Sequence, residues 1–349
     1  MKNIIFSLFL IAVLALGSSA QNPTKSTREA AQLLNRGDVR GAIGVLDKAI
    51  EDRKDLFEAY KMRAFLRPMT GDFAGAVDDL SKAIEIKPDE GALYERRAWL
   101  RSRLRQDGSL ILKDLDLAIA YGRKVEKVYT MRATVKRDSG DLEGAINDYQ
   151  TAIGLRLDFA QAHVGLALAH LRSRDEDKAV AVLENFLSGY ENSLVKNPKV
   201  KGEVVAQSEI MPLPTVSKDG TTGVSTIVIQ SGAPRRMPSS PEEAEKINDQ
   251  IEQAKNTAVA YTNLAGIYER RGELKKAMET IEKALAIDAT DAFPLGVRGK
   301  IKSSQKDYAG AVEDLNVAIA KMPFSPQNYL ERGIALLMLG REAEAQKDF

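Results

Sequence analysis

The sequence predicts an all-α solenoid in which short helix pairs repeat along the chain and stack on one another. Three observations predict this fold. First, alanines recur in one local pattern, and neighbouring copies such as Ala42 and Ala76 lie 34 residues apart. Second, another alanine follows most of these after seven residues, as Ala49 and Ala83 do. Third, a glycine precedes most copies, where a tight turn between two helices requires it.

The second helix of each repeat has the clearest pattern. Four copies can be aligned directly: GDVRGAIGVLDKAI from Gly37, GDFAGAVDDLSKAI from Gly71, GDLEGAINDYQTAI from Gly140 and GELKKAMETIEKAL from Gly272. Their apolar residues recur at i, i+3, i+4 and i+7, which predicts an amphipathic helix. The small alanines mark the points where helices approach closely. Pro88 and Pro323 follow two of these helices and are expected to stop them.

The 34-residue spacing, the Gly-Asp turns and the A-x-x-x-L/Y-x-x-A helix resemble the tetratricopeptide repeat (TPR) family. This resemblance implies a right-handed superhelix of helix pairs, with a concave face that binds peptides or partner proteins. It places repeats at about 23–56, 57–90, 91–125, 126–159, 160–193, 258–291, 292–325 and 326–349. The chain then consists of an array of five repeats over 21–193 and an array of three over 258–349. The last repeat stops within a helix, so part of its apolar face is expected to be bare.

An N-terminal segment, Met1–Ala20, has the layout of a signal peptide. Lys2 precedes an apolar run from Ile4 to Leu16, and small residues occupy positions 17–20. The run is shorter than the roughly 20 residues that span a bilayer. We therefore expect cleavage after Ala20 and a periplasmic or secreted protein, with an uncleaved anchor as the alternative.

Composition favours a binding protein over an enzyme. The chain has no cysteine, only two histidines, and nearly balanced charge, with 50 Lys plus Arg against 49 Asp plus Glu. This balance gives no electrostatic reason to expect nucleic acid as a partner. His163 and His170 lie seven residues apart on one predicted helix, too far apart to share a metal unaided, and both are expected to pack. No motif for a catalytic, cofactor or metal site is present, so we predict none of these sites.

Comparison of the repeats with one another reveals a paired charge pattern. Five repeats carry Arg in one first-helix slot and Asp in one second-helix slot: Arg63 and Asp79, Arg97 and Asp114, Arg132 and Asp148, Arg298 and Asp314, Arg332 and Asp348. The other three repeats have neither residue, with Glu29, Leu166 and Leu264 in the first slot and Val45, Val182 and Thr280 in the second. Paired loss favours a structural salt bridge, within a repeat or between neighbours, because a buried charge needs its partner. The alternative is a row of arginines that faces an anionic ligand.

The region 194–257 interrupts the array. Ala179 and Ala277 lie 98 residues apart instead of 34, so 64 residues are inserted. Asp219-Gly220 is a hairpin-turn signal between β-leaning runs, Glu203–Met211 and Val224–Gln230. A helix is predicted from Pro241 to Asn256, continuing into the next repeat. The insertion is either a flexible surface loop or a hairpin that lies over the concave face or offers a strand to a partner.

The resemblance also implies that first helices line the concave face. The corresponding residues are Lys61, Phe65, Trp99, Thr134, Arg137, Val164, Leu168 and Leu171. Phe65 and Trp99 occupy the same slot of successive repeats, and either anchor a partner or pack between repeats. The clamp that some family members use for C-terminal carboxylates is not matched, because Phe65 stands where that clamp needs Asn.

These observations lead to one functional expectation and one alternative. The chain is expected to be an exported scaffold that binds a protein or peptide through its concave face, without cofactor and without a membrane span after cleavage. The alternative is a structural component of a cell-envelope assembly that docks through the insertion at 194–257.

Overall fold

The computed structural model describes residues 24–53, 56–196, 215–216, 222–223 and 241–349. The predicted signal peptide, Met1–Ala20, lies outside these residues. The chain divides into two compact units, described separately below. Unit 1 comprises Met1–Leu157 with Pro238–Glu245, and unit 2 comprises Asp158–Met237 with Lys246–Phe349.

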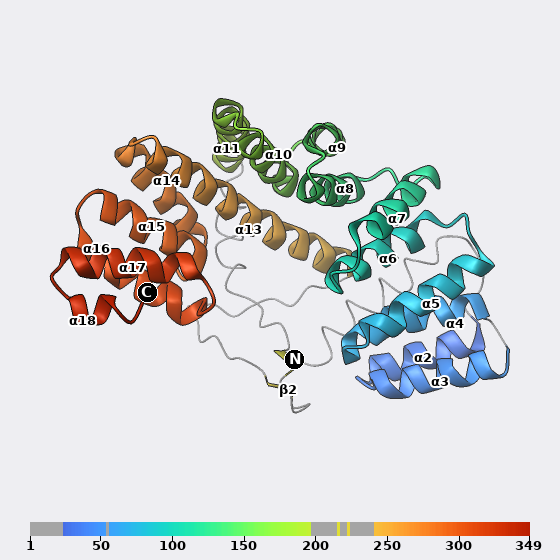
Figure 1. The fold of residues 1–349 in the computed structure, drawn as a ribbon. Helices are drawn as coiled ribbons and strands as arrows, with labels where there is room; N and C mark the ends of the chain where they lie inside the picture. The colour runs from blue at the N-terminus through green and yellow to red at the C-terminus, as the bar shows by residue number, and fades with distance from the viewer. Residues whose placement is uncertain (1–23, 54–55, 197–214, 217–221, 224–240) are drawn as a thin grey trace. The chain divides into compact units, whose positions relative to one another are not determined.

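Unit 1 is a stack of helix pairs (Figure 1). Its helices are α2 (Lys25–Asn35), α3 (Val39–Glu51), α4 (Leu56–Leu66), η1 (Arg67–Thr70), α5 (Phe73–Ile86), α6 (Gly91–Arg103), α7 (Gly108–Ala120), α8 (Glu126–Ser139) and α9 (Leu142–Leu155). Each helix packs against the next one in the chain, both within a pair and between pairs. The predicted first and second helices of the first four repeats are therefore all present.

The Gly-Asp turns act as the sequence predicts. Gly71 has a φ of 85°, which glycine adopts without the strain a side chain would cause. Asp72 then caps α5, because its carboxylate accepts a hydrogen bond from the Gly75 N–H at 2.8 Å. The same cap recurs at Asp141, which accepts from the Gly144 N–H at 2.9 Å. In these two repeats the second helix thus starts at a position that two adjacent residues fix.

The repeating alanines lie at helix contacts. Ala42, Ala76 and Ala83 are completely buried, and so are the leucines next to them, such as Leu46 and Leu115. A methyl side chain allows two helix backbones to approach closely, while leucine fills the remaining space. The 34-residue alanine pattern is therefore the packing pattern of the fold.

Unit 2 continues the same architecture, with an interruption. It contains α10 (Ala160–Arg172), α11 (Glu176–Lys196), most of α13 (Pro241–Arg270), α14 (Leu274–Ile287), α15 (Ala292–Ser304), α16 (Tyr308–Lys321), α17 (Pro326–Met338) and α18 (Glu342–Ala345). Between α11 and α13, β1 (Thr215–Val216) pairs antiparallel with β2 (Thr222–Gly223). The strands predicted at 203–211 and 224–230, and the turn at Asp219-Gly220, lie outside the described residues.

Helices α11 and α13 join the repeats on either side of the insertion. The Tyr261 hydroxyl donates to Glu191 at 2.8 Å, and Arg271 Nε donates to Glu176 at 2.7 Å. These contacts run in opposite directions along the two helices, so α11 and α13 are antiparallel. Leu183 and Leu187 share one core with Ala258 and Tyr261. In the sequence, segment 197–240 connects the C-terminal end of α11 to the start of α13.

The helix predicted from Pro241 to Asn256 is present and continues without a break to Arg270. This changes the extent of the insertion, which the sequence placed at 194–257. Ala254 and Thr257 are only 2% and 1% exposed. The last residues of the inserted stretch are consequently part of the packed core, and the inserted segment proper ends earlier.

Candidate partner-binding surface

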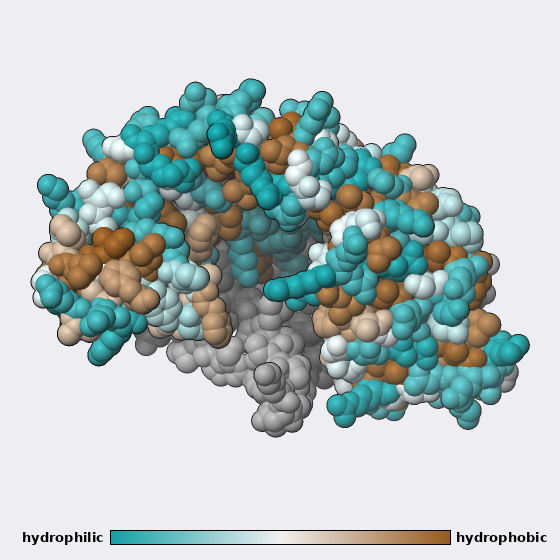
Figure 2. Space-filling view, in the orientation of Figure 1, coloured by the Kyte–Doolittle hydropathy of each residue, from teal (hydrophilic) through white to brown (hydrophobic). Residues whose placement is uncertain are grey.

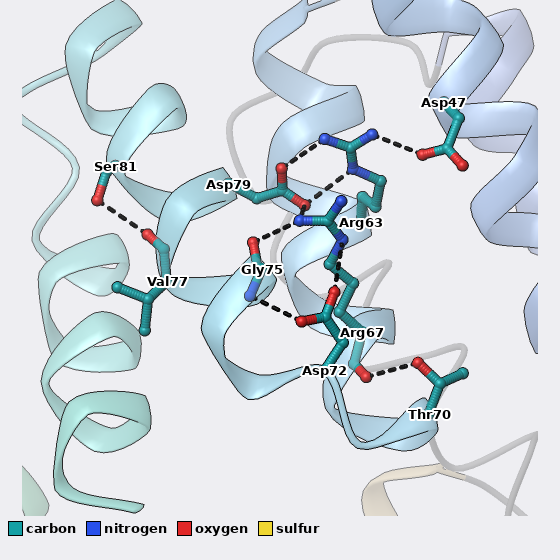
Figure 3. Close-up of polar contacts among 9 residues, drawn as sticks. All are labelled: Asp47, Arg63, Arg67, Thr70, Asp72, Gly75, Val77, Asp79 and Ser81. Carbon is teal, nitrogen blue, oxygen red and sulfur yellow. Dashed lines mark hydrogen bonds and ion pairs between the residues drawn. The ribbon is translucent and has the colours of Figure 1, made fainter. Parts of the chain in front are cut away.

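The Arg and Asp residues of the charge pattern are paired in all five repeats. Each arginine donates from Nε and Nη2 to the two carboxylate oxygens of its aspartate, at 2.5–3.0 Å in every pair. Figure 3 shows this arrangement for Arg63 and Asp79. Asp79 is 2% exposed and Asp114 is fully buried. The aspartates therefore lie between helices, not on a ligand-facing surface.

Each arginine also reaches back to the preceding repeat. Its Nη1 donates to a side chain 16 residues earlier in the chain, on the second helix of that repeat. The acceptors are Asp47 for Arg63, Ser81 for Arg97, Asp116 for Arg132, Glu282 for Arg298 and Asn316 for Arg332. The sequence left open whether the bridge lies within a repeat or between repeats. In the structure, each arginine bonds both to the aspartate of its own repeat and to a side chain of the preceding repeat.

A second cation supports four of these five aspartates. It lies four residues after the arginine, one helical turn further on, and is Arg67, Arg101, Lys136 or Lys302. The sequence comparison missed this slot, although the same alignment contains it. The hydrogen bonds that Arg132 donates to Asp148 raise the pKa of the Arg132 guanidinium. Burial alone would raise the pKa of Asp314, but the bonds from Arg298 and Lys302 outweigh it and lower that pKa.

Repeats five and six, which lack the pair, fill the same slots with uncharged groups. In repeat five, Leu166 replaces the arginine and His170 replaces the second cation, and both are buried. Burial lowers the pKa of His170, which keeps its imidazole neutral near pH 7. In repeat six, Leu264 and Tyr268 occupy these slots and are also buried. In these two repeats the arginine, the second cation and the aspartate are thus all replaced together.

Several of the predicted surface residues have partners of their own. Lys61 donates to Glu90 at 2.6 Å, and its side chain is only 11% exposed. The Thr134 hydroxyl lies 2.9 Å from the Tyr149 hydroxyl, and Arg137 Nη1 donates to the same oxygen at 3.4 Å. These three residues are consequently held in place by neighbouring side chains, and Lys61 is not a free cation.

The predicted surface residues of unit 2 belong mainly to its core. Val164 is 8% exposed and lies in the cluster that joins α10, α11 and α13. Leu168 and Leu171 are partly buried and pack against that same cluster. This cluster therefore buries most of the Val164 side chain, and a role of Val164 in partner binding stays a prediction.

Phe65 and Trp99 both lie close to one residue that the sequence analysis did not single out. The Cζ atom of Arg96 lies 5.0 Å from the ring centroid of Phe65 and 4.6 Å from that of Trp99. Phe65 comes from α4, whereas Arg96 and Trp99 come from α6, one turn apart. The two aromatic residues are therefore close in space, as predicted, and a guanidinium connects them. We refer to Phe65, Arg96 and Trp99 as the Arg96 site.

Arg96 differs electrostatically from the arginines next to it on α6. Arg97 and Arg101 both donate to Asp114. Within the described ranges, Arg96 makes no hydrogen bond or ion pair, and its Nε is buried without an acceptor. Burial lowers its pKa, and the weaker attraction of Glu95 does not compensate. The Arg96 site thus holds a half-buried cation without a carboxylate bound to it.

Unit 2 has an apolar surface on α17. Leu330, Ile334 and Leu337 recur at i, i+4 and i+7, which places them on one face of this helix. They are 44%, 41% and 45% exposed. Figure 2 shows an apolar patch over the C-terminal helices. Contiguous exposed apolar residues of this kind mark interaction sites.

Among the residues that the structure describes, no cluster of His, Cys, Asp and Glu has the arrangement of a metal site. In the same part of the chain, no helix combines the length and apolar character needed to cross a membrane.

Comparison with known proteins identifies the repeats. Two segments match family models described as Tetratricopeptide repeat, at residues 130–191 and 258–291. Tetratricopeptide repeat protein 36 from Bos taurus is 32% identical over 120 residues, which cover 31% of this chain and 62% of that protein. A FAM10 family protein from Arabidopsis thaliana is 32% identical over 77 residues, covering 22% of this chain and 18% of that protein. The chain therefore spans less than two thirds of the length of either relative.

The fold is shared with solved repeat proteins. The crystal structure of the APC/C hetero-tetramer Cut9-Hcn1 superimposes with a TM-score of 0.56, at 14% identity, over 96% of this chain and 54% of that one. At this level of identity the likeness concerns the fold alone. It supports an all-α helical repeat array over nearly the whole chain.

Proposed function

We propose that this chain, a protein with tetratricopeptide repeats, is an exported scaffold that binds a protein or peptide partner through its first-helix surfaces. Proteins built from such repeats are typically scaffolds for protein interactions rather than enzymes. The Arg96 site carries the proposal most directly, because it combines two aromatic side chains with a cation that lacks a carboxylate. Aromatic and Arg residues are the side chains most often found at the energetic centre of protein interfaces.

The distribution of charge supports this assignment of surfaces. The five Arg–Asp pairs share the same geometry, in which the arginines hold helices together. These arginines are therefore not available to a partner. The exposed apolar stripe on α17 and the Arg96 guanidinium, by contrast, are not part of such an Arg–Asp pair in the described helices. Each lies on a first helix of its own unit.

Export is part of the proposal and rests on the sequence of Met1–Ala20. If the segment is a cleaved signal peptide, the mature protein begins at Gln21. Mass spectrometry of the N-terminal peptide, from protein isolated out of its own cells, tests this directly. Retention of residues 1–20 on the mature protein would favour an uncleaved anchor.

The binding surface can be tested by photo-crosslinking in cells. A photoreactive residue placed at Arg103, beside Trp99 on α6, should capture a discrete partner, because the Arg103 guanidinium already lies 5.9 Å from the Trp99 ring. The same residue placed at Lys113, exposed on second helix α7, should not. Capture should fall at least tenfold when Phe65 and Trp99 are replaced by alanine, with circular dichroism confirming the fold. Equal capture from both positions would contradict the proposed surface.

The alternative, docking through the insertion, is favoured by one observation. Helix α11 and residues 258–268 of α13 share one core, so the chain is packed on both sides of segment 197–240. Replacing 197–240 with a Gly/Ser linker of about twelve residues should leave unit 2 folded, because the core residues of α11 and α13 all lie outside the replaced range. Loss of the crosslinked partner in this variant, with the Phe65 and Trp99 variant still binding, would support insertion-mediated assembly instead.

A further inference from the structure

The Arg96 guanidinium contacts aromatic rings but makes no hydrogen bond within the described residues. Its guanidinium lies against two aromatic rings, which attract a cation through their electron-rich faces. These contacts, however, leave its N–H donors unused: in the described helices Arg96 makes no hydrogen bond, and its Nε is buried without an acceptor. Charged side chains removed from water are normally paired, because the unpaired state is costly.

The neighbouring carboxylates are already committed to other cations. Asp114 binds Arg97 and Arg101, and Glu95 binds Arg123. Glu90, at the start of α6, binds Lys61 at 2.6 Å. The local surplus of positive charge therefore remains at Arg96, and the exposed Arg103, also near the Trp99 ring, adds to it.

The geometry of the guanidinium shows which of its atoms can serve a ligand. Of its three nitrogens, only Nε is both buried and unpaired, so the two terminal nitrogens reach solvent. A guanidinium stacked on ring faces keeps its N–H donors in the plane of the group, where they match the two oxygens of a carboxylate. The rings fix the guanidinium in advance, so less side-chain entropy is lost on binding.

We infer that the Arg96 site binds a carboxylate of the partner, with Phe65 and Trp99 contacting the apolar part of the group that carries it. This inference rests on the proposed function and specifies the chemistry of its ligand. A carboxylate fits a single fixed guanidinium, whereas phosphate groups are usually bound by clusters of arginines. The carboxylate can come from an Asp or Glu side chain or from a peptide C-terminus.

The test uses an array of short peptides rich in apolar residues, synthesised as matched sets. Within each set, one peptide carries Glu, one carries Gln at the same position, and each is made with a free and an amidated C-terminus. Peptides that bind the full chain are then titrated in solution. Trp99, the only tryptophan in the sequence, reports binding at the site through its fluorescence.

Bound peptides should prefer a carboxylate form over its amide by about tenfold or more, as expected for a charge-assisted bidentate contact. The Arg96→Gln variant should bind acid and amide forms equally. The Lys113→Gln variant, which loses the same charge from an exposed position on α7, should keep the preference. Comparison of the Glu/Gln and acid/amide pairs identifies the source of the carboxylate.

Other outcomes separate this inference from the function on which it rests. If peptides bind but acid and amide forms have equal affinity, the carboxylate inference is wrong while peptide binding stands. An unchanged preference in Arg96→Gln would place the carboxylate elsewhere and would also overturn it. If no peptide binds the wild-type chain, the inference and peptide binding through this surface fail together. Circular dichroism of each variant confirms that these differences do not reflect unfolding.

Discussion

Replacing Asp114 with valine is expected to lower the free energy of unfolding of unit 1 by roughly 3–5 kcal/mol. Asp114 is fully buried. It accepts hydrogen bonds from Arg97 Nη2 at 2.6 Å and from Arg101 Nη1 at 2.7 Å. Its removal leaves two guanidiniums between helices without a counter-charge. Urea unfolding followed by circular dichroism measures the loss.

Asp116 offers a matched control two residues away on the same helix. It accepts a hydrogen bond from Arg132 at 2.7 Å, but its side chain is 62% exposed. Water therefore solvates the carboxylate and screens the pair, and Asp116→Val should cost less than about 1 kcal/mol. Similar losses in the two variants would mean that burial does not set the strength of these pairs.

The chain itself supplies a design that should restore stability. Repeat six carries Leu264, Tyr268 and Thr280 in the slots of Arg97, Arg101 and Asp114. A variant of repeat three with Arg97→Leu, Arg101→Tyr and Asp114→Thr should recover most of the stability lost in Asp114→Val, because no charge remains unpaired. If the triple variant were as unstable as Asp114→Val, the complete charged cluster would itself stabilise the fold. The cost in Asp114→Val would then not come only from the unpaired charges.

The repeat comparison predicted these pairs for a physical reason. A buried carboxylate cannot lose its cation without a large penalty, so substitutions in the two slots occur together even within one chain. The helix positions were predictable for a similar reason, since Gly71 and Asp72 each fulfil a local backbone requirement. Requirements of this kind involve residues that are close in the sequence or that belong to one repeat, so a sequence comparison can detect them.

Features that depend on contacts between repeats were less accessible. Val164 resembles a surface residue in its slot, but the core shared by α10, α11 and α13 buries it. Lys61 is neutralised by Glu90, which lies 29 residues further along the chain. Arg96 could have been noticed, since it is one helical turn before Trp99. Its position between two rings, however, depends on how α4 and α6 pack, which no local pattern specifies.

The insertion illustrates the same limit at a larger scale. Its composition and the spacing of Ala179 and Ala277 revealed that 64 residues are inserted. The sequence did not reveal that α11 extends to Lys196, or that residues of α13 before the repeat boundary, such as Ala254 and Thr257, are buried. Helices α11 and α13 both extend past the ends of their repeats, at residues 193 and 258. The ends of the repeats therefore do not coincide with the ends of the packed core.

This packing across the insertion leads to the second large effect. Replacing Leu183 with alanine is expected to lower the free energy of unfolding of unit 2 by about 2–5 kcal/mol. Leu183 is completely buried in the core that α10 and α11 share with α13 and α14. Removal of its side chain leaves a cavity at the junction of repeats five and six. Because the long insertion separates these two repeats in the sequence, their junction depends on packing. Urea unfolding of the full chain measures the effect.

Val317 provides the comparison for an exposed aliphatic residue in the same unit. It is 45% exposed on α16, so Val317→Ala should change stability by less than about 0.5 kcal/mol. Repeat arrays gain stability from the interfaces between neighbours, so a defect at one interface can divide the array. Leu183→Ala should therefore also increase proteolytic cleavage in the C-terminal part of α11 relative to Val317→Ala, because α11 is loosened from α13. If cleavage there were unchanged while global stability fell, the contact between α11 and α13 would not be what holds α11 in place.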